Sequence, residues 1–424
     1  MIKFALQPEA QPMSAGDVRD THVAPVPRIS IQAFCESADI AAVMQDAASD
    51  RRMIKAHVKV QMGGVAAAVE AYRNSPTPNV IVIESESKSE DLLAGLDALA
   101  EVCDAGTRVI VIGLVNDILL YRELVRRQIS DYLIAPIGVL DVIRSLSGLF
   151  GSPDAKPVGR TLAVVGAKGG VGASTVAHNI AWAIARDLQL DAVVADLDLP
   201  FGTAGLDYNQ DPAQGIADAV FSPERIDTSF VDRLLAKCTD HLSLLAAPAT
   251  LDRAYDFNPE AFDGIFDVLR ASVPFTVMDV PHLWTGWSRR VLIGADDILI
   301  VAAPDLANLR NVKNLIDLLR QQRPNDAPPH YCLNQVGVPK RPEIKPADFA
   351  RALEAEPSVI IPFEPQMFGT AANNGQMIAE VSASHRAAEL FRQLAQQMTG
   401  RAEQKRPRNS LLTPLFERLK LRSA

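Results

Sequence analysis

The stretch Gly166-Ala-Lys-Gly-Gly-Val-Gly-Ala-Ser-Thr175 decides the fold of the second half of this chain. It follows the apolar run 161–165 and precedes the apolar-striped segment 176–188, which predicts a strand, a glycine-rich loop and a helix in that order. Small residues let the backbone curl so that N–H groups and the positive end of the helix converge on an anion. The sequence therefore predicts a phosphate-binding loop.

The end of this loop departs from the usual pattern. Such loops normally carry a lysine directly before the final hydroxyl residues, and here Ala173 stands before Ser174 and Thr175. Because the missing lysine normally neutralises charge on the β- and γ-phosphates, we expect ATP to bind while hydrolysis is very slow or absent. Ser174 is expected to ligate Mg²⁺ and Thr175 to contact the inner phosphate. The nucleotide-binding residues predicted from the loop are Lys168, Gly169, Gly170, Val171, Gly172, Ala173, Ser174 and Thr175.

The loop has a lysine at an earlier position, Lys168, and this position is typical of one family of ATPases. The pattern Lys168-Gly-Gly-Val-Gly-x-Ser-Thr175 resembles the deviant phosphate loop of the ParA/MinD ATPases. This resemblance covers about residues 161–400 and implies ATP and Mg²⁺ as cofactors and an ATP-linked homodimer. It also implies that Lys168 reaches across the dimer to the nucleotide of the partner subunit.

Polar residues at later strand ends follow the order of the same family. Asp196-Leu-Asp198 resembles its first switch segment, which implies that Asp198 positions the attacking water and that Asp196 belongs to the magnesium shell. Asp279 resembles the second acidic strand end, another magnesium-shell residue, and Asn334 and Pro362 match positions that hold the adenine. Taken singly, such residues often cap helices or end strands as turn residues. Their shared order favours a nucleotide site.

The first half of the chain alternates short apolar runs with helical patterns. This alternation predicts a parallel sheet with helices on both faces, so the expected fold class is α/β with two doubly wound parallel-sheet domains. The expected strands are 29–34, 57–60, 79–83, 108–112 and 132–134, and the expected helices are 38–48, 64–73, 92–102 and 119–127.

The first domain resembles the receiver domain of bacterial response regulators, with five such strands ending in Ser130-Asp-Tyr-Leu-Ile-Ala-Pro136. Receivers place an aspartate after the third strand, a hydroxyl after the fourth and a lysine before the proline. Here these positions are Glu84, Gly113 and Ala135. Glu84 either imitates the charge of a phosphorylated aspartate or marks a retired site in a docking domain. We favour docking, because the groups that read the charge are missing.

Changes in composition mark the expected domain limits. Proline-bearing polar sequence predicts a flexible tail, a Pro- and Gly-bearing segment predicts a linker, and basic residues among leucines predict an amphipathic tail. These limits are residues 1–27 for the flexible tail, 28–150 for the receiver-like domain, 151–160 for the linker, 161–400 for the nucleotide-binding domain and 401–424 for the basic tail.

Charge and composition exclude several classes. A net charge of −9 argues against a surface built for nucleic acid. The beginning of the chain lacks an export signal and no apolar run is long enough to cross a bilayer, so we expect a cytoplasmic protein. Neither the four cysteines nor the histidines form a metal or catalytic pattern. The isolated residues are Cys35, Cys103, Cys238 and Cys332, and His178, His282 and His385.

A receiver-like domain joined to a ParA/MinD-like domain is similar to the CpaE/TadZ family of Flp-type (Tad) pilus assembly proteins. That resemblance implies a factor that dimerises with ATP, sits at a cell pole or other assembly site, and contacts pilus assembly and secretion components. Two alternatives are open for the basic tail 401–424: peripheral contact with the inner membrane, or docking to a partner protein. An alternative function is a ParA-like positioning or DNA-segregation ATPase with active turnover.

Overall fold

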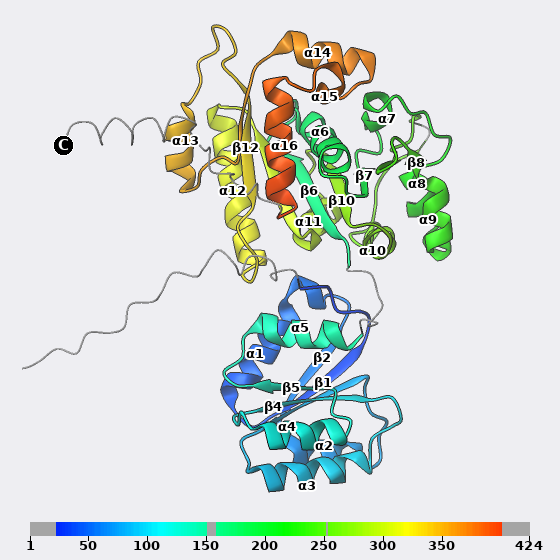
Figure 1. Ribbon diagram of the computed structural model, residues 1–424, viewed down its shortest axis with the longest axis vertical. Helices are drawn as coiled ribbons and strands as arrows, with labels where there is room; N and C mark the ends of the chain where they lie inside the picture. The colour runs from blue at the N-terminus through cyan, green and yellow to red at the C-terminus, as the bar shows by residue number, and fades with distance from the viewer. Residues whose placement is uncertain (1–22, 151–157, 252, 401–424) are drawn as a thin grey trace, which may run out of the picture.

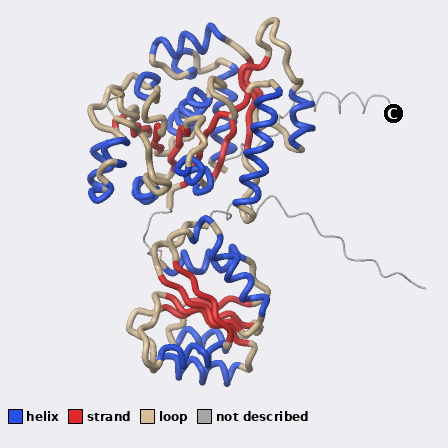
Figure 2. The backbone as a smooth tube through the Cα atoms, turned by 180° about the vertical axis from the view of Figure 1, so that it is seen from behind, coloured by secondary structure: helices blue, strands red, loops and turns tan. Residues whose placement is uncertain are grey.

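Two sheets of mainly parallel strands, one in each half of the chain, organise the structure (Figure 1). It is a computed structural model that describes residues 23–150, 158–251 and 253–400. In both halves helices lie on either side of the strands, as Figure 2 shows from behind. The predicted fold class, α/β with two doubly wound parallel-sheet domains, is confirmed. None of the described helices is long and apolar enough to cross a membrane.

The N-terminal domain has a five-stranded sheet in the order β2-β1-β3-β4-β5, with all neighbours parallel. This is one of the common doubly wound orders. The central strand β3 is buried throughout, with Val80 and Val82 in one core cluster and Ile81 and Ile83 in the other. The strands are β1 (Ser30–Cys35), β2 (His57–Met62), β3 (Val80–Ser85), β4 (Arg108–Gly113) and β5 (Asp131–Ile134).

Helices form a layer on each face of this sheet. One layer faces the second domain and the other lies on the far side of the molecule (Figure 1). The near layer is α1 (Ala38–Ser49), the short helix η2 (Arg51–Met53) and α5 (Val139–Leu149), and the far layer is α2 (Gly64–Tyr72), α3 (Ser89–Ala100) and α4 (Ile118–Arg126).

The domain begins before the predicted boundary. Val23 and Val26 are 2% and 1% exposed and belong to the core cluster under α1 and α5. The backbone N–H of Val26 also donates to the carbonyl oxygen of Arg52 at 2.8 Å. The prediction of a flexible tail up to residue 27 is therefore wrong for residues 23–27, because two valines at its end are buried. Residues 1–22, most of the linker (151–157) and the basic tail (401–424) lie outside the described residues.

The second domain has an eight-stranded sheet in the order β13-β12-β11-β6-β10-β7-β9-β8. Its strand pairs are parallel except β8 with β9, and the sequence analysis missed these two strands. The strands are β6 (Arg160–Gly166), β7 (Ala192–Asp196), β8 (Ala236–Lys237), β9 (Leu242–Leu245), β10 (Phe275–Val280), β11 (Asp297–Ala302), β12 (His330–Val336) and β13 (Ile360–Pro362).

Helices cover both faces of this sheet too. Residues of β6 alternate between two cores, Leu162 and Val164 on one face and Ala163 and Val165 on the other. The first core contains α6 (Ala173–Arg186), α7 (Ala204–Asp207), α14 (Pro365–Asn374), α15 (Ile378–Val381) and α16 (Arg386–Met398). The second contains α8 (Ile216–Val220), α9 (Thr228–Leu234), α10 (Asp263–Ser272), α11 (Gly286–Gly294), α12 (Leu306–Gln322) and α13 (Pro346–Leu353).

A network of buried charges joins the two domains. The Arg51 guanidinium contacts Asp326 with Nε 2.7 Å from Oδ2, and contacts Asp296 at 3.4 Å. Arg52 contacts Asp326 as well, and Asn325 donates to Asp50 Oδ2 at 2.9 Å. The ion-pairing side chains are at most 7% exposed. Removing one partner of such a group leaves a buried charge without compensation, so the network holds the domains in one arrangement.

The junction lies at the amino ends of the second sheet. Asp296 directly precedes β11, and its carboxylate accepts a hydrogen bond from the backbone N–H of Thr161 in β6 at 2.9 Å. The opposite edge of the sheet, where the phosphate loop lies, faces away from the N-terminal domain (Figure 1). The first domain therefore leaves the candidate site uncovered.

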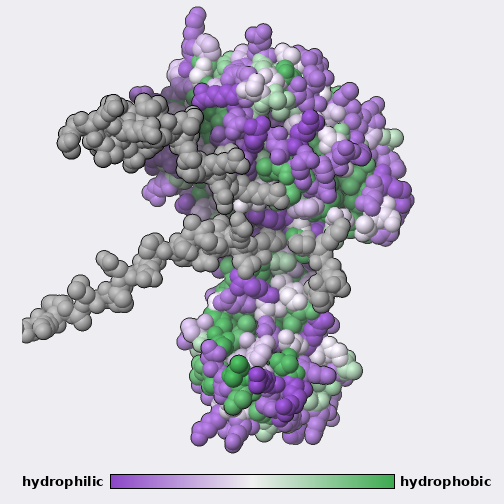
Figure 3. Space-filling view, in the orientation of Figure 1, coloured by the Kyte–Doolittle hydropathy of each residue, from purple (hydrophilic) through white to green (hydrophobic). Residues whose placement is uncertain are grey.

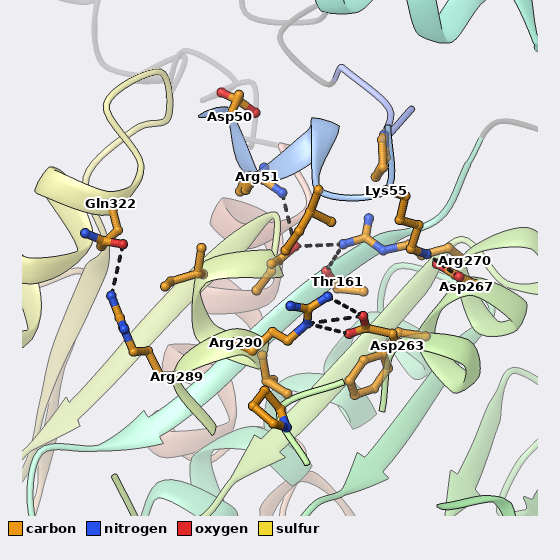
Figure 4. Close-up of a pocket in the computed structure, with 18 of the residues that line it drawn as sticks. Asp50, Arg51, Lys55, Thr161, Asp263, Asp267, Arg270, Arg289, Arg290 and Gln322 are labelled. Atoms are coloured by element: carbon orange, nitrogen blue, oxygen red, sulfur yellow. Dashed lines mark hydrogen bonds and ion pairs between the residues drawn. The ribbon is translucent and has the colours of Figure 1, made fainter. Parts of the chain in front are cut away.

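A cavity of about 540 Å³ lies beside this network (Figure 4). Cations from both domains line it, and each contacts a side chain of the protein. Lys55 contacts Asp267, Arg290 donates bidentately to Asp263 from Nε to Oδ1 and from Nη2 to Oδ2, and Arg289 donates to Gln322 Oε1 at 3.1 Å. Of these contacts, the ion pair of Lys55 with Asp267 joins the two domains, whereas the other two lie within the second domain.

Candidate nucleotide site

The glycine-rich loop joins β6 to α6, as the sequence predicted. Gly170 and Gly172 have φ values of +78° and +83°, a left-handed conformation that glycine adopts without steric cost. A Cβ atom built on Gly169 or Gly170 would meet no atom within 4 Å. The exposed top of the loop therefore borders open space at the start of a helix, as a phosphate cradle requires.

Side chains from β12, from α12 and from the segment after β10 hold the loop through its carbonyl oxygens. Because these oxygens bond to the protein, the N–H groups of the loop remain for an anion. Asn334 also lies directly against Gly172, where a Cβ atom would be 2.6 Å from its Nδ2. The contacts are Asn334 Nδ2 to Val171 O (2.9 Å), Gln335 Nε2 to Gly170 O (3.0 Å), Asn311 Nδ2 to Ala167 O (2.8 Å) and His282 Nδ1 to Gly166 O (2.8 Å).

Asp196 is fully buried at the carboxyl end of β7. Its Oδ1 accepts from the N–H of Asp198 and its Oδ2 from the N–H of Ala204, both at 3.1 Å. A Cβ on Gly202 would lie 2.3 Å from Oδ2, so only glycine allows this close turn. Asp196 thus shapes the switch segment, defined here as residues 196–207. Burial and the charge of Asp279 raise its pKa to about 7.

Asp198 lies half-buried in the first turn of the switch segment. Its Oδ1 accepts from the N–H of Phe201 at 3.2 Å, and its pKa is raised chiefly by burial. A carboxylate held by one backbone donor keeps acceptor capacity on its second oxygen. This geometry is compatible with the predicted orientation of a water molecule.

Asp279 lies opposite Asp196 in the register of β10 with β7, so the two predicted magnesium-shell carboxylates are direct neighbours. His178, from α6, adds a cation beside them. Its Nε2 is 3.4 Å from Asp279 Oδ2 and its Nδ1 is 2.7 Å from Asp207 Oδ2. Burial alone would lower the pKa of His178, but the hydrogen bond to Asp207 and the charges of Asp207 and Asp279 raise it to about 10.

The donor set fits a magnesium ion bound together with phosphates. Mg²⁺ usually takes one or two carboxylates, phosphate oxygens and water. Asp196 and Asp279 supply the carboxylates and Ser174, at the start of α6, a hydroxyl. Within the described ranges, no group of three or more His, Cys, Asp or Glu side chains could hold a metal alone. An ion here would therefore depend on a nucleotide.

The structure brings most predicted site residues to one edge of the sheet. The loop, both strand-end aspartates and Asn334 converge there, and Pro362 on β13 pairs with Val336 of the neighbouring strand β12. Sequence reasoning missed His178, Gln335 and Asn311 as residues of this site. A signal for His178 was present, because it lies four residues after Ser174 and therefore on the same helix face.

The receiver-like site is filled by the protein itself. Glu84 is 5% exposed at the end of β3, and its carboxylate accepts from the N–H groups of Glu36 and Ser37 at 2.8 and 3.0 Å. The Ser37 hydroxyl donates to it at 2.6 Å. At Gly113 a Cβ would lie 2.4 Å from the Tyr132 hydroxyl, which occupies the place of the missing side chain. Glu84 therefore holds the start of α1, a role that the sequence analysis did not foresee.

Known proteins are similar to parts of this chain. No protein-family model matches the chain. MinD, the septum site-determining protein of Synechocystis, is 27% identical over 164 residues, 38% of this chain and 60% of its own length. That of Bacillus subtilis is 25% identical over 191 residues, 42% of this chain and 66% of its own length. The chain thus spans less than two thirds of each of these relatives.

Solved structures share the fold at lower identity. A ParA family ATPase from Chlorobium tepidum has a TM-score of 0.51 at 22% identity, over 57% of this chain and 98% of its own. MinD from Pyrococcus horikoshii, solved with Mg-ADP, has a TM-score of 0.50 at 17% identity, over 56% of this chain and 95% of its own. Fold and loop thus define a protein of the ParA/MinD type.

Sequence identity places the chain more narrowly. The pilus assembly protein CpaE of Caulobacter crescentus is 47% identical along its whole solved chain, which covers 31% of this one, with a TM-score of 0.30. CpaE2 of Sinorhizobium meliloti is 39% identical over 99% of its solved chain and 28% of this one, with a TM-score of 0.28. On this identity, the chain belongs to the CpaE family of pilus assembly proteins.

Proposed function

We propose that this protein is an ATP-binding, dimerising localisation and assembly factor for a Flp-type pilus secretion machine, with weak or no ATP hydrolysis. The observation that carries the proposal is Ala173 at the first position of α6, beside a complete loop. The backbone cradle would bind phosphates, and Ser174, Asp196 and Asp279 would hold Mg²⁺. The ion would neutralise phosphate charge, but the loop lysine that stabilises charge during transfer is replaced by a methyl group.

Two features at the carboxyl edge support an ATP-linked dimer. Lys168 is exposed at the top of the loop, where its ammonium group can reach a nucleotide on a second subunit. Exposed apolar side chains surround the same edge, on the switch segment, after β10 and at the start of α12. They are Phe201, Leu206, Leu283, Trp284 and Leu306, each 52–73% exposed. Apolar side chains gathered around a polar site are typical of an interaction surface.

ATP binding, hydrolysis and mass, measured on one purified sample, test the proposal. We expect ATP and Mg²⁺ to convert the chain into a larger species with negligible phosphate release. Lys168→Ala should keep ATP binding and lose the nucleotide-dependent increase in mass. Steady phosphate release at a rate ordinary for ParA-type ATPases, abolished by Asp198→Ala, would contradict it.

That second outcome would favour a ParA-like positioning or DNA-segregation ATPase with active turnover. The observation that supports this alternative is the position of Asp198, whose Oδ1 accepts a hydrogen bond from the backbone N–H of Phe201. DNA binding that weakens as the salt concentration rises would favour the DNA-segregation function over the pilus function. The net charge of −9 argues against the DNA role.

Peripheral contact with the inner membrane is proposed for the tail 401–424. Its leucines and basic residues suit an anionic lipid surface. Flotation of the full chain and of a chain ending at residue 400 with anionic liposomes tests this contact. Equal flotation of both chains would assign the tail to a protein partner.

A further inference from the structure

A histidine lies beside the phosphate loop, close to Ala173 at the position of the usual lysine. The His282 imidazole donates from Nδ1 to the carbonyl oxygen of Gly166, which begins the loop, at 2.8 Å. A Cβ atom built on the same glycine would lie 3.5 Å from the Cβ of Ala173. His282 and Ala173 therefore approach the same residue of the loop, although they come from different elements.

The pairing of two central strands brings this histidine to the loop. Strands β10 and β6 are parallel neighbours with Val280 opposite Val165, so the segments that follow them leave the sheet side by side. Both segments lie at the carboxyl edge, at the end of the second domain that points away from the first domain (Figure 3). His282 is exposed at this edge, where ligands bind in doubly wound folds.

The backbone holds His282 in a tight turn. The N–H of Leu283 donates to the carbonyl oxygen of Pro281 at 2.7 Å, so His282 is the central residue of a three-residue turn. The hydroxyl of Ser288, in the first turn of α11, donates to the carbonyl oxygen of Leu283 at 2.7 Å. The imidazole therefore projects from a segment that is already fixed on both sides.

One ring nitrogen of His282 remains for a ligand. A carbonyl oxygen accepts but cannot donate, so Nδ1 carries the proton in the bond to Gly166. No described residue forms a hydrogen bond with Nε2. When Nε2 is protonated as well, the ring is a cation that donates from both nitrogens. It can then hold Gly166 and an anion at the same time.

We propose that His282 donates from Nε2 to the phosphates of ATP and supplies there the positive charge that a lysine at position 173 would supply. This inference rests on the ATP binding of the proposed function and adds a binding residue to it. The methyl group of Ala173 can make no such contact, and the family resemblance assigns Lys168 to the nucleotide of the partner subunit. His282 gives each subunit a cation for its own nucleotide. Charge-assisted hydrogen bonds of this kind are about twice as strong as neutral ones.

The bond to Gly166 alone has a structural explanation, because Asn311 and Asn334 brace neighbouring carbonyl oxygens of the loop in the same way. Two substitutions of His282 separate bracing from phosphate binding. In His282→Asn the amide nitrogen takes the place of Nδ1 and keeps the brace. In His282→Gln it takes the place of Nε2 and keeps the outer donor without its charge.

Titration calorimetry of the full chain with ATP and Mg²⁺ tests the proposal. We expect His282→Asn to weaken ATP binding about tenfold or more, and His282→Gln to weaken it less. His241→Asn is the matched control and should bind like wild type. His241 is also exposed, but it directly precedes β9 at the opposite edge of the sheet. If His282→Asn binds ATP at least as tightly as His282→Gln does, the histidine only braces the loop and the proposal is overturned.

A double substitution tests whether His282 replaces the lysine. Adding Ala173→Lys to His282→Asn should remove most of the loss in ATP affinity, because the new ammonium group makes the same contact. Residues that share a partner in this way have non-additive effects. Urea unfolding of the same samples shows that each variant is folded. A loss that Ala173→Lys leaves unchanged would mean that His282 does not stand in for the lysine.

The same titrations separate this inference from the proposed function. A wild-type chain that binds no ATP would contradict both. If wild type binds ATP and dimerises while His282→Asn binds ATP equally well, the assignment of His282 fails and the proposed function stands.

Discussion

The imidazole of His178 lies 2.7 Å from the carboxylate of Asp207 and joins the helix after the phosphate loop to the end of the switch segment. The same ring approaches Asp279, so one buried cation lies among acids that a magnesium ion would otherwise neutralise. The Tyr208 hydroxyl donates to the His178 carbonyl oxygen at 2.7 Å and strengthens the link between α6 and α7. These contacts tie the end of the switch segment to the helix that follows the glycine-rich loop.

Replacing His178 should destabilise the second domain. His178→Asn removes the cation and leaves two carboxylates with less compensation, which costs about 3–5 kcal/mol when a buried pair is broken. Urea unfolding measures the free-energy difference. His241→Asn is a matched control, since His241 contacts Asp191 at 2.8 Å but both side chains are exposed, and such pairs contribute about 1 kcal/mol or less. Equal effects of the two substitutions would contradict a structural role for His178.

Restoring the loop lysine should raise turnover. In Ala173→Lys the new ammonium group can neutralise charge on the outer phosphates, and one preorganised charge is worth on the order of 10²–10³ in rate. Phosphate release under saturating ATP measures the gain. Ala173→Met provides similar length without charge and should stay at the wild-type rate. A lysine variant no faster than the methionine variant would mean that Ala173 does not limit hydrolysis.

Local sequence patterns predict most of the fold and the core of the site. The strands around the loop are buried on both faces and read as continuous apolar runs. In contrast, β8 and β9 have only two and four residues, which is too few to show a strand pattern in the sequence. The aspartates could be assigned because they follow the order of the resembled family, and the carboxyl ends of parallel strands bring them to one edge.

Contacts between distant residues could not be predicted in this way. Arg51 and Asp326 are 275 residues apart, and neither belongs to a motif. His178 sits among alanines and isoleucines on α6, where a histidine resembles a core residue. Its role depends on Asp207 and Asp279, which only the folded chain brings to it. The same holds for Tyr132, whose place at Gly113 follows from the pairing of β4 with β5.

The receiver-like site should not accept a phosphoryl group. Glu84 is buried and accepts three hydrogen bonds from the start of α1, so neither oxygen is presented to a phosphodonor. Incubation with a small phosphodonor should leave the protein unlabelled. Glu84→Gln should lower the free energy of unfolding by about 1–3 kcal/mol, because the amide keeps only one of the two oxygens that accept these hydrogen bonds. Labelling that vanishes in Glu84→Ala would instead identify a working phosphorylation site.

The junction between the domains should weaken in acid because of Asp326. Burial alone would raise the pKa of this carboxyl, but hydrogen bonding to Arg51 and the charges of Arg51, Arg323 and Arg52 lower it to about 2. Since this lies below the ordinary value of 3.8, the stabilisation is present above pH 4 and is lost as the pH falls toward 2. Asp326→Asn should lower the free energy of unfolding by about 3–5 kcal/mol at pH 7. The difference in this free energy between the variant and wild type should narrow below pH 4. Urea unfolding at several pH values, with hydrogen exchange of the η2 backbone, measures both effects.

The exposed pair of Asp348 with Arg351 offers the control Asp348→Asn, which should change the free energy of unfolding little at any of these pH values. If the difference in unfolding free energy between Asp326→Asn and wild type stays constant between pH 7 and pH 3, Asp326 is not the group that holds the domains together.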